Sequence, residues 1–340
     1  MRTAIDIGGG LIKLVEGQAK GDGVAVRRAV TIPTPADSAR DGRILDAEAV
    51  AAAIRQGLEA AGIRLGALTF TLGSTQLLHR ELKAPRMAPR KLAPVVGNEM
   101  MQHLTGGEDF AVDYLLTGEP AAEDPRLQII AASAVPKEMV RDFLTLTRLL
   151  RARPDTLQMH PSALGKLFAH GSVNGTLTEG RGFIVCDIGL HLLHIYLYAS
   201  HRLLFTRCIK APCEAFFASV QRMLGYESGQ QVLESFSVLP ERLIKNLNAA
   251  SAASGLLSFL SEELSRMLQF SLSRGLPSPV SRIYLTGGVS SLGGLCENLS
   301  SSSGVAVERV ERFLGVTGID PGELALYANA VGALSNWPSR

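Results

Sequence analysis

Near its start the chain reads Arg2-Thr-Ala-Ile-Asp6-Ile-Gly8-Gly9-Gly10-Leu-Ile-Lys13-Leu-Val-Glu16, a glycine turn between two apolar segments. Apolar and β-branched residues on both sides of the glycines predict two short strands joined as a hairpin. Three successive glycines allow the backbone to approach a ligand closely with its N–H groups turned outward. Such a turn is suited to cradle phosphate, and Asp6 is placed to hold a hydrated magnesium ion beside it.

The same pattern returns in the second half as Phe183-Ile-Val-Cys-Asp187-Ile-Gly189, followed by apolar residues up to Tyr198. A single Asp-Ile-Gly is most often an ordinary tight turn. Two copies, each opening one half of the chain, predict a duplicated fold with two lobes. A third glycine site, Leu285-Thr-Gly287-Gly288, lies between a predicted strand and a predicted helix, where adenine or ribose could lie against the backbone.

Composition excludes several classes of protein. The 340 residues, 46% of them hydrophobic, are enough for one large core or two ordinary ones. A formal net charge of +2 gives no support for nucleic-acid binding through a strong positive field. No apolar run approaches the roughly 20 residues that a membrane span needs, so we expect a cytoplasmic protein. The four cysteines include no Cys-x-x-Cys pair and are expected to be buried thiols.

Hydrophobic spacing predicts the elements of the first half. After the hairpin we expect a strand, a helix and a strand, over residues 24–32, 46–61 and 67–72. From His79 onwards the sequence is basic and interrupted by prolines. Beyond it we expect a helix, two strands, a helix and a short strand, over residues 89–104, 110–117, 127–134, 136–150 and 155–159. We interpret this part as a compact inserted subdomain.

The second half is expected to repeat the opening hairpin. A short helix over 161–168 and a loop over 171–182 lead to three strands, over residues 182–188, 192–199 and 202–209. Helices are then expected over residues 213–224, 229–236, 252–274 and 292–299. A polar loop at 300–303, a strand over 305–310 and a closing helix over 321–334 complete the chain.

Taken in order, Asp-x-Gly with a following lysine, a second Asp-x-Gly and a late Gly-Gly resemble the actin/Hsp70/sugar-kinase superfamily. Within it the chain most closely resembles PilM, the FtsA-like protein of type IV pilus assembly. The opening Ala4–Glu16, Asn98-Glu99-Met100, Phe205-Thr-Arg207 and Leu285–Leu295 occur in PilM-like order. The resemblance implies an α/β, actin-like fold of two duplicated, ribonuclease H-like lobes with an inserted FtsA/PilM-type 1C subdomain.

The expected domains follow from this resemblance. They are a lobe I core (subdomain 1A, 1–79), the inserted subdomain 1C (80–157), a crossing helix with a linker (158–181), lobe II with a helical subdomain (182–320) and the closing helix (321–340). In FtsA and PilM a mobile subdomain occupies this point of the chain.

The resemblance also implies ATP or ADP with Mg²⁺ between the lobes. The candidate nucleotide-binding residues are Asp6, Gly8, Gly9, Gly10, Lys13, Asp187, Gly189, Gly287 and Gly288. Asp6 and Asp187 would hold Mg²⁺ through water. No residue is assigned as catalytic.

The site departs from that of an active ATPase. Glycines at positions 9 and 10 offer no hydroxyl ligands, and residues 190–194 after the second turn are Leu-His-Leu-Leu-His rather than small or hydroxyl residues. Gln158 and His160 stand where PilM proteins commonly carry Asp and Glu, and Gln158 cannot act as a general base. The cleft is therefore either nucleotide-binding or degenerate, with at most weak ATPase activity. His191 and His194 are an odd number of residues apart on a strand and are expected to point to opposite faces.

The implied partner is the N-terminal segment of PilN, an inner-membrane protein. In PilM this segment binds in the groove beside the inserted subdomain. Backbone pairing is one way to bind such a peptide. Two interpretations of a basic set stay open, a surface for an acidic segment or a membrane, and a solvated helix start: Arg80, Lys83, Arg86, Arg90 and Lys91. The protein would then be peripheral at the inner membrane through its partner, with homo-oligomers left open.

Three other functions remain open at this point. An active ATPase or kinase of the superfamily needs the turn residues but is disfavoured by the departures above. An FtsA-type division protein would end in a basic amphipathic helix, whereas this chain ends Leu334-Ser-Asn-Trp337-Pro-Ser-Arg340. The cytoplasmic part of a type II secretion GspL protein shares the architecture but continues into a membrane helix.

Overall fold

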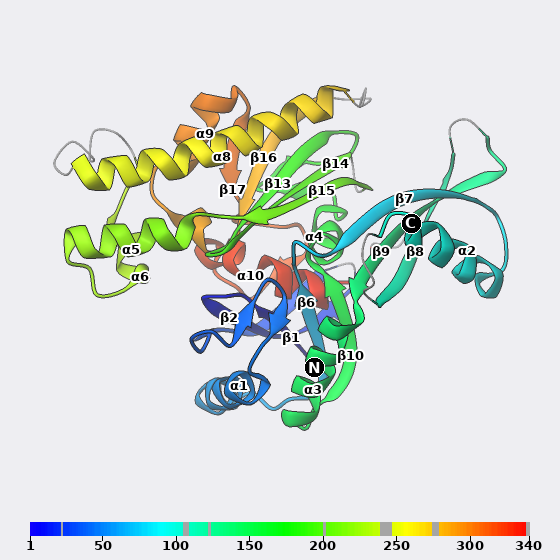
Figure 1. Cartoon of the computed structure of the whole chain (residues 1–340), viewed down its shortest axis with the longest axis horizontal. Helices are drawn as coiled ribbons and strands as arrows, with labels where there is room; N and C mark the ends of the chain where they lie inside the picture. Colours follow the sequence, from blue (N-terminus) through cyan, green and yellow to red (C-terminus); the bar gives the residue numbers. More distant parts are fainter. Residues whose placement is uncertain are drawn as a thin grey trace.

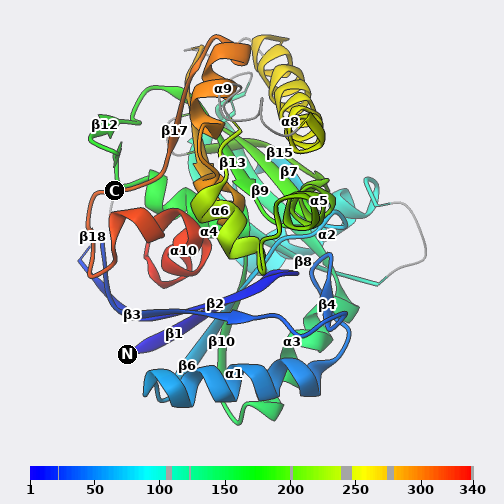
Figure 2. The same ribbon diagram turned by 90° about the vertical axis from the view of Figure 1, so that its left-hand side faces the viewer.

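The computed structural model describes residues 1–21, 23–104, 109–121, 124–199, 202–238, 247–273 and 279–337. Three places lie outside this range: the last residue of the helix expected over 252–274, part of the connection between the strands expected over 110–117 and 127–134, and residues 338–340 of the closing segment. Two main sheets lie one above the other with helices between them (Figures 1 and 2), and a further small sheet projects to one side (Figure 1).

The first main sheet is built on the opening hairpin. Its strands span Arg2–Ile7 (β1), Leu11–Lys20 (β2), Gly23–Pro33 (β3), Ala67–Leu72 (β6), Arg153–Met159 (β10) and Val316–Thr317 (β18). Their order is β10-β6-β1-β2-β3-β18. β1 is antiparallel to β2 and parallel to β6, with Asp6 paired with Lys13. The predicted hairpin is thus confirmed, with Asp6 inside the strand rather than at the bend.

Two helices cover the outer face of this sheet (Figure 2). They span Ala47–Ala61 (α1) and Lys137–Leu149 (α3). α1 begins where the Asp46 side chain accepts a hydrogen bond from Ala49 N, and it ends at Gly62, whose φ of 63° is left-handed. A side-chain cap and a left-handed glycine satisfy the backbone groups at the two helix ends. We call this sheet with α1 and α3 lobe I.

The second main sheet repeats the first. Its strands span Gly182–Ile188 (β13), Leu192–Ala199 (β14), Arg202–Lys210 (β15), Val280–Thr286 (β16) and Ala306–Arg309 (β17), in the order β15-β14-β13-β16-β17. β13 is antiparallel to β14 and parallel to β16, as β1 is to β2 and β6. Helices on its outer face span Cys213–Leu224 (α5), Gly229–Ser235 (α6), Leu247–Ser273 (α8) and Leu295–Ser303 (α9). These elements form lobe II.

Two apolar helices fill the space between the main sheets (Figure 2). They are His160–Phe168 (α4) and Pro321–Leu334 (α10). Ala4 and Val15 of the first sheet share one core with Phe183 and Val185 of the second through these helices. α10 is buried on nearly every side, as expected for a helix that is apolar all round. At Gly332 a Cβ atom would lie 2.3 Å from the carbonyl oxygen of Ala163, so the two helices touch through glycine.

The small sheet, which we call the inserted sheet, has its own core. It contains Leu78–Pro85 (β7), Phe110–Pro120 (β8) and Leu127–Pro136 (β9) in the order β7-β9-β8, and the helix Pro89–Met101 (α2) covers one face. Leu92, Val96 and Met100 of α2 pack on Leu82 and Ile130 of the strands. No strand was predicted where β7 lies, only a basic stretch. The pattern of a strand is hidden there because the exposed face of β7 carries charges and the strand ends at proline.

The inserted unit expected over 80–157 needs one correction. α3 and β10, which the sequence analysis groups with it, pack in lobe I instead. β10 pairs in parallel with β6, and Phe143 and Leu146 of α3 lie in the core of the first sheet. A parallel partner for β6 requires a crossover connection, and the inserted sheet together with α3 supplies it. How the chain divides into independently moving units stays a prediction.

Three smaller expectations change as well. Ser300–Ser303 is the last turn of α9 rather than a loop, with Ser301 and Ser303 hydroxyls donating to carbonyls one turn earlier. The loop expected over 171–182 contains a short hairpin, Ser172–Val173 (β11) with Thr176–Leu177 (β12). The Gly-Gly turn leads first into a 3-10 helix, Gly288–Ser291 (η1), before α9 begins.

Within the described part of the chain, no helix is both long and apolar enough to cross a membrane.

Candidate functional site

The two Asp-Ile-Gly turns meet between the lobes. Asp6 lies near the end of β1 and Asp187 near the end of β13, and both side chains are buried. His160, the first residue of α4, lies between them. Its Nε2 atom is 2.9 Å from Asp6 Oδ1 and its Nδ1 atom is 3.5 Å from Asp187 Oδ2. One imidazole therefore lies between the carboxylates of the two lobes, hydrogen-bonded to Asp6, while its Nδ1 atom forms no hydrogen bond with the described residues.

Asp6 is held by three side chains. Besides His160, Lys13 Nζ lies 3.0 Å from Oδ2 and the Thr71 hydroxyl donates to Oδ1 at 3.1 Å. Burial alone would raise the pKa of Asp6, but the charges and hydrogen bonds of Lys13 and His160 hold that pKa well below its usual value. The carboxylate is therefore ionised and accepts hydrogen bonds, so His160 Nε2 carries the proton that it donates to Asp6.

Asp187 is fixed from the central layer. The Asn329 amide, on α10, donates to Oδ2 at 2.9 Å. The third glycine turn lies against the same carboxylate, because a Cβ atom at Gly287 would be 2.5 Å from Oδ1. Gly287 also has a φ of 84°, which only glycine adopts readily. We call Asp6, Lys13, Thr71, His160, Asp187 and Asn329 the interlobe cluster.

The first and second glycine turns are in direct contact. A Cβ atom at Gly9 would lie 2.0 Å from His191 Nδ1, and one at Gly10 would lie 2.9 Å from the Leu190 side chain. His191 precedes β14 rather than lying on it, and its Nε2 atom is 3.2 Å from Glu214 Oε2. The turn that the sequence analysis assigns to phosphate therefore faces side chains of the other lobe.

His194, in contrast, is buried inside β14 and packs edge-on against the ring of His160 at 5.3 Å. Burial, with a smaller contribution from His160, lowers the pKa of His194 to about 4. It is therefore neutral at physiological pH and supports the position of the His160 ring.

In this arrangement the residues do not fit a nucleotide phosphate with Mg²⁺. A phosphate group is larger than a methyl group, yet a methyl group at Gly9 or Gly10 would already collide with the second turn. Both carboxylate oxygens of Asp6 and Oδ2 of Asp187 accept hydrogen bonds from protein donors. Among the described residues, no group of three His, Cys, Asp or Glu side chains is arranged to hold a metal ion.

The basic residues proposed for a partner are exposed but do not form one patch. Arg80 and Lys83 are an odd number of residues apart on β7 and so point to opposite faces. Arg86, Arg90 and Lys91 lie together at the start of α2. The inserted sheet is joined to lobe II by Arg202 of β15, which forms ion pairs with Glu81 and Glu119.

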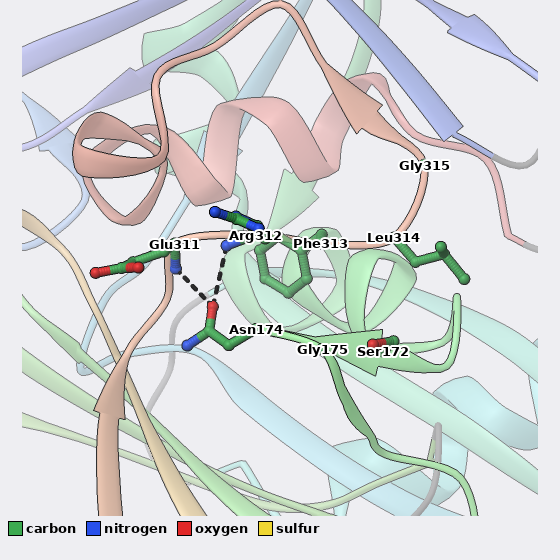
Figure 3. Close-up of a pocket in the computed structure, with 8 residues that line it drawn as sticks. All are labelled: Ser172, Asn174, Gly175, Glu311, Arg312, Phe313, Leu314 and Gly315. Atoms are coloured by element: carbon green, nitrogen blue, oxygen red, sulfur yellow. Dashed lines mark hydrogen bonds between the residues drawn. The ribbon is translucent and has the colours of Figure 1, made fainter.

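A surface pocket of about 530 Å³ lies away from the cluster, beside the β11–β12 hairpin (Figure 3). Asn174 builds its wall by accepting hydrogen bonds from the backbone N–H groups of Glu311 and Arg312, at 2.8 and 3.0 Å. The other lining residues are Ser172, Gly175, Phe313, Leu314 and Gly315. Their polar groups mostly contact one another. Such contacts hold two loops together and leave few polar groups for a ligand.

Several residues of the cluster escape sequence reasoning. Asn329 could have been suspected, because it is a polar residue in an otherwise apolar helix. Thr71 carries no local signal, and nothing in the sequence indicates that His194 packs against His160. Gln158, which the sequence analysis considered for orienting water, instead donates to the carbonyl oxygen of Ala333 at 3.1 Å and ties β10 to α10.

Two lobes, each built on a hairpin with a parallel neighbour and with their Asp-Ile-Gly turns facing each other, define an actin-like protein. The chain belongs to the PilM family of type IV pilus assembly proteins, which it matches over residues 4–326. It is similar to a chain of the PilM-PilN type IV pilus biogenesis complex, with a TM-score of 0.79, 22% identity, and 98% of this chain and 99% of that chain covered.

A second solved structure is the ethanolamine utilization protein EutJ from Carboxydothermus hydrogenoformans, with a TM-score of 0.56 and 14% identity, covering 98% of this chain and 89% of that one. At these identities both structures bear on the fold alone. No curated protein matches the sequence.

Proposed function

We propose that this protein is a cytoplasmic adaptor of type IV pilus assembly, or of a related type II secretion system, that binds the cytoplasmic N-terminal segment of a PilN-like inner-membrane protein. The observation that carries this proposal is the family match over residues 4–326. The similarity over nearly the whole chain to a protein of a PilM-PilN complex supports it. The partner would hold the protein at the inner membrane as a peripheral component.

The inserted sheet offers the binding surface. β7 lies next to lobe II through Arg202, whereas β8 pairs only with β9 within the described residues. Leu115 and Leu116 of β8 are about half exposed, at 48% and 52%. An edge strand with exposed apolar side chains can accept an extended peptide through main-chain hydrogen bonds and side-chain contacts.

Charge at the start of α2 supports an acidic peptide. Arg86, Arg90 and Lys91 are exposed and form no ion pair with a described carboxylate. Positive charges in the first helical turn oppose the helix dipole, so Arg90 and Lys91 do not contribute to the stability of α2. They are available to attract a negatively charged partner segment, more strongly at low salt.

A peptide titration tests the proposal. The probe is a fluorescent synthetic peptide with the N-terminal segment of the PilN protein from the same source, followed by anisotropy. The triple variant Arg86→Glu/Arg90→Glu/Lys91→Glu should bind about tenfold more weakly or worse. A control with the same change in charge, Lys20→Glu/Arg64→Glu/Arg153→Glu, alters exposed residues of lobe I and should bind like the wild type. No binding by the folded wild type would refute the proposal.

An active ATPase or kinase is not proposed, because no observation favours it and the contacts between the turns oppose it.

A further inference from the structure

We propose that the cleft of this protein is a permanently closed contact, in which His160, between Asp6 and Asp187, and Lys13, paired with Asp6, take the place of a nucleotide and its cation. Resting on the function proposed above, this makes the protein an adaptor that binds its partner without a nucleotide cycle. Three features of the interlobe cluster carry the inference: the bridge itself, the packing of the turns, and the helices that support both.

The interlobe cluster supplies each carboxylate with donors from the protein. Two buried carboxylates facing each other are costly unless positive or donor groups lie between them. Asp6 receives Lys13, Thr71 and His160, and Asp187 receives Asn329 while facing the second nitrogen of His160. These donors therefore already satisfy the carboxylates that would otherwise attract a hydrated Mg²⁺ to this point.

The turns are packed and anchored. His191 covers Gly9 and Leu190 covers Gly10, so side chains of the second turn fill the space beside the first. The second turn is held in this position by the start of α5: Glu214 N donates to the Leu190 carbonyl oxygen at 3.2 Å, and the Glu214 carboxylate faces His191. Opening a phosphate site would require breaking both contacts at once.

The two central helices, α4 and α10, hold the residues around His160 in place. His160 begins α4, and Asn329 belongs to α10, which touches α4 at Gly332. His194 and His160 both lie against Gly73, where a Cβ atom would be 2.5 Å from His160 Nδ1 and 2.7 Å from His194 Cε1. His160 thus belongs to the central helical layer that both lobes share, and not to a hinge at the edge of that layer.

Nucleotide binding and hydrogen exchange test this together. The full chain is titrated calorimetrically with Mg-ATP and with Mg-ADP, and its Tm is measured with and without each. We expect no binding heat and no rise in Tm. A saturable isotherm with a higher Tm would overturn the proposal, because a ligand that binds the folded state must stabilise it.

Hydrogen exchange then tests the bridge. In the wild type the peptides covering residues 5–14 and 186–195 should exchange slowly and equally with and without Mg-ATP. In His160→Ala both should exchange at least about tenfold faster, since closure depends on the bridge. His103→Ala removes an exposed histidine elsewhere and should leave both peptides unchanged. Unchanged exchange in a folded His160→Ala variant would show that His160 does not hold the lobes.

If His160→Ala fails to fold, His160→Gln is measured instead, because its amide keeps a donor near Asp6 but removes the second ring nitrogen from Asp187. The peptide titration is repeated with Mg-ATP. Equal affinity with and without Mg-ATP is expected, and a change in affinity overturns the inference. A wild type that binds neither peptide nor nucleotide refutes the proposed function but not the closed cleft.

Discussion

His160 and Asp6 show how much one buried pair contributes at the scale of the residue. Asp6 has a side chain only 3% exposed and accepts from three groups, whereas Asp37, paired with Arg40, has a side chain 86% exposed. Breaking a buried pair leaves charges without partners in a medium of low polarity, while an exposed pair returns to water.

Asp6→Asn should therefore lower the free energy of unfolding by about 3 kcal/mol near neutral pH. Asp37→Asn, the exposed control, should change it by less than about 0.5 kcal/mol. Because the pKa of Asp6 is depressed in the folded state, its contribution is present above the ordinary value of 3.8 and is lost as the pH falls below it. Urea unfolding at several pH values measures the free energy of unfolding of the wild type and of Asp6→Asn. The two curves of this free energy against pH should converge in acid.

His194 gives a second pH dependence at this scale. Burial lowers its pKa from 6.5 to about 4, so the unfolded chain binds a proton at a higher pH than the folded one. Stability is then fully present above 6.5 and is lost as the pH falls towards 4. Between about pH 7 and about pH 5 the loss due to His194 should be about 2 kcal/mol.

His194→Gln should remove that part of the slope, because the amide does not titrate. The measurement is the difference in unfolding free energy between the two pH values for wild type and variant. His103→Gln, at an exposed position, serves as the control and should retain the wild-type slope. Equal slopes for His194→Gln and wild type would contradict the burial argument.

At the scale of the element, two helical glycines have opposite roles. Gly332 of α10 meets the backbone of α4, with 2.3 Å from its ideal Cβ position to Ala163 O, whereas a Cβ at Gly97 of α2 meets nothing within 4 Å. The first glycine exists for close packing of the central layer. The second only costs helix stability.

Gly332→Ala should destabilise the protein by about 1–3 kcal/mol, since the methyl group forces the central helices apart. Gly97→Ala should instead stabilise it by up to about 1 kcal/mol through helix propensity. Thermal and urea unfolding of both variants compare the two effects directly. A stabilising Gly332→Ala would mean that α4 and α10 are not in backbone contact.

At the scale of the whole molecule, the inserted sheet has a core of its own and few ties to the lobes (Figure 1). Arg202 is one of them, reaching Glu81 at 2.8 Å and Glu119 at 2.6 Å. Such partly exposed ion pairs contribute little to global stability but restrict the position of one part relative to another.

Arg202→Ala should leave the unfolding free energy within about 1 kcal/mol of the wild type. Amide exchange in β7 and β8 should nevertheless become faster, since the sheet loses a tie to lobe II. Arg126→Ala removes an ion pair to Asp124 that lies within the inserted region itself, and it should not affect β7. Mass spectrometry of exchanged peptides resolves the two strands.

Local pattern alone predicted much of the fold. The limits predicted for β6, α5 and the closing helix α10 agree with the structure, because spacing, caps and prolines act over a few residues. β7 was missed because alternating charges and terminal proline hide the alternation of Leu82 and Ala84. The two Asp-Ile-Gly motifs and the late Gly-Gly indicated which residues lie together, since Asp6 and Asp187 both face His160 and Gly287 lies against Asp187; a role in nucleotide binding stays a prediction.

The sequence by itself therefore determined the duplicated hairpins, the helices, and membership of the PilM family. Only the tertiary structure decided that α3 and β10 belong to lobe I and that His160 lies between two aspartates, one of them 154 residues away. The same holds for His191 against Gly9. The physical reason is that these contacts depend on how α4 and α10 pack between the sheets, which no local spacing of residues encodes.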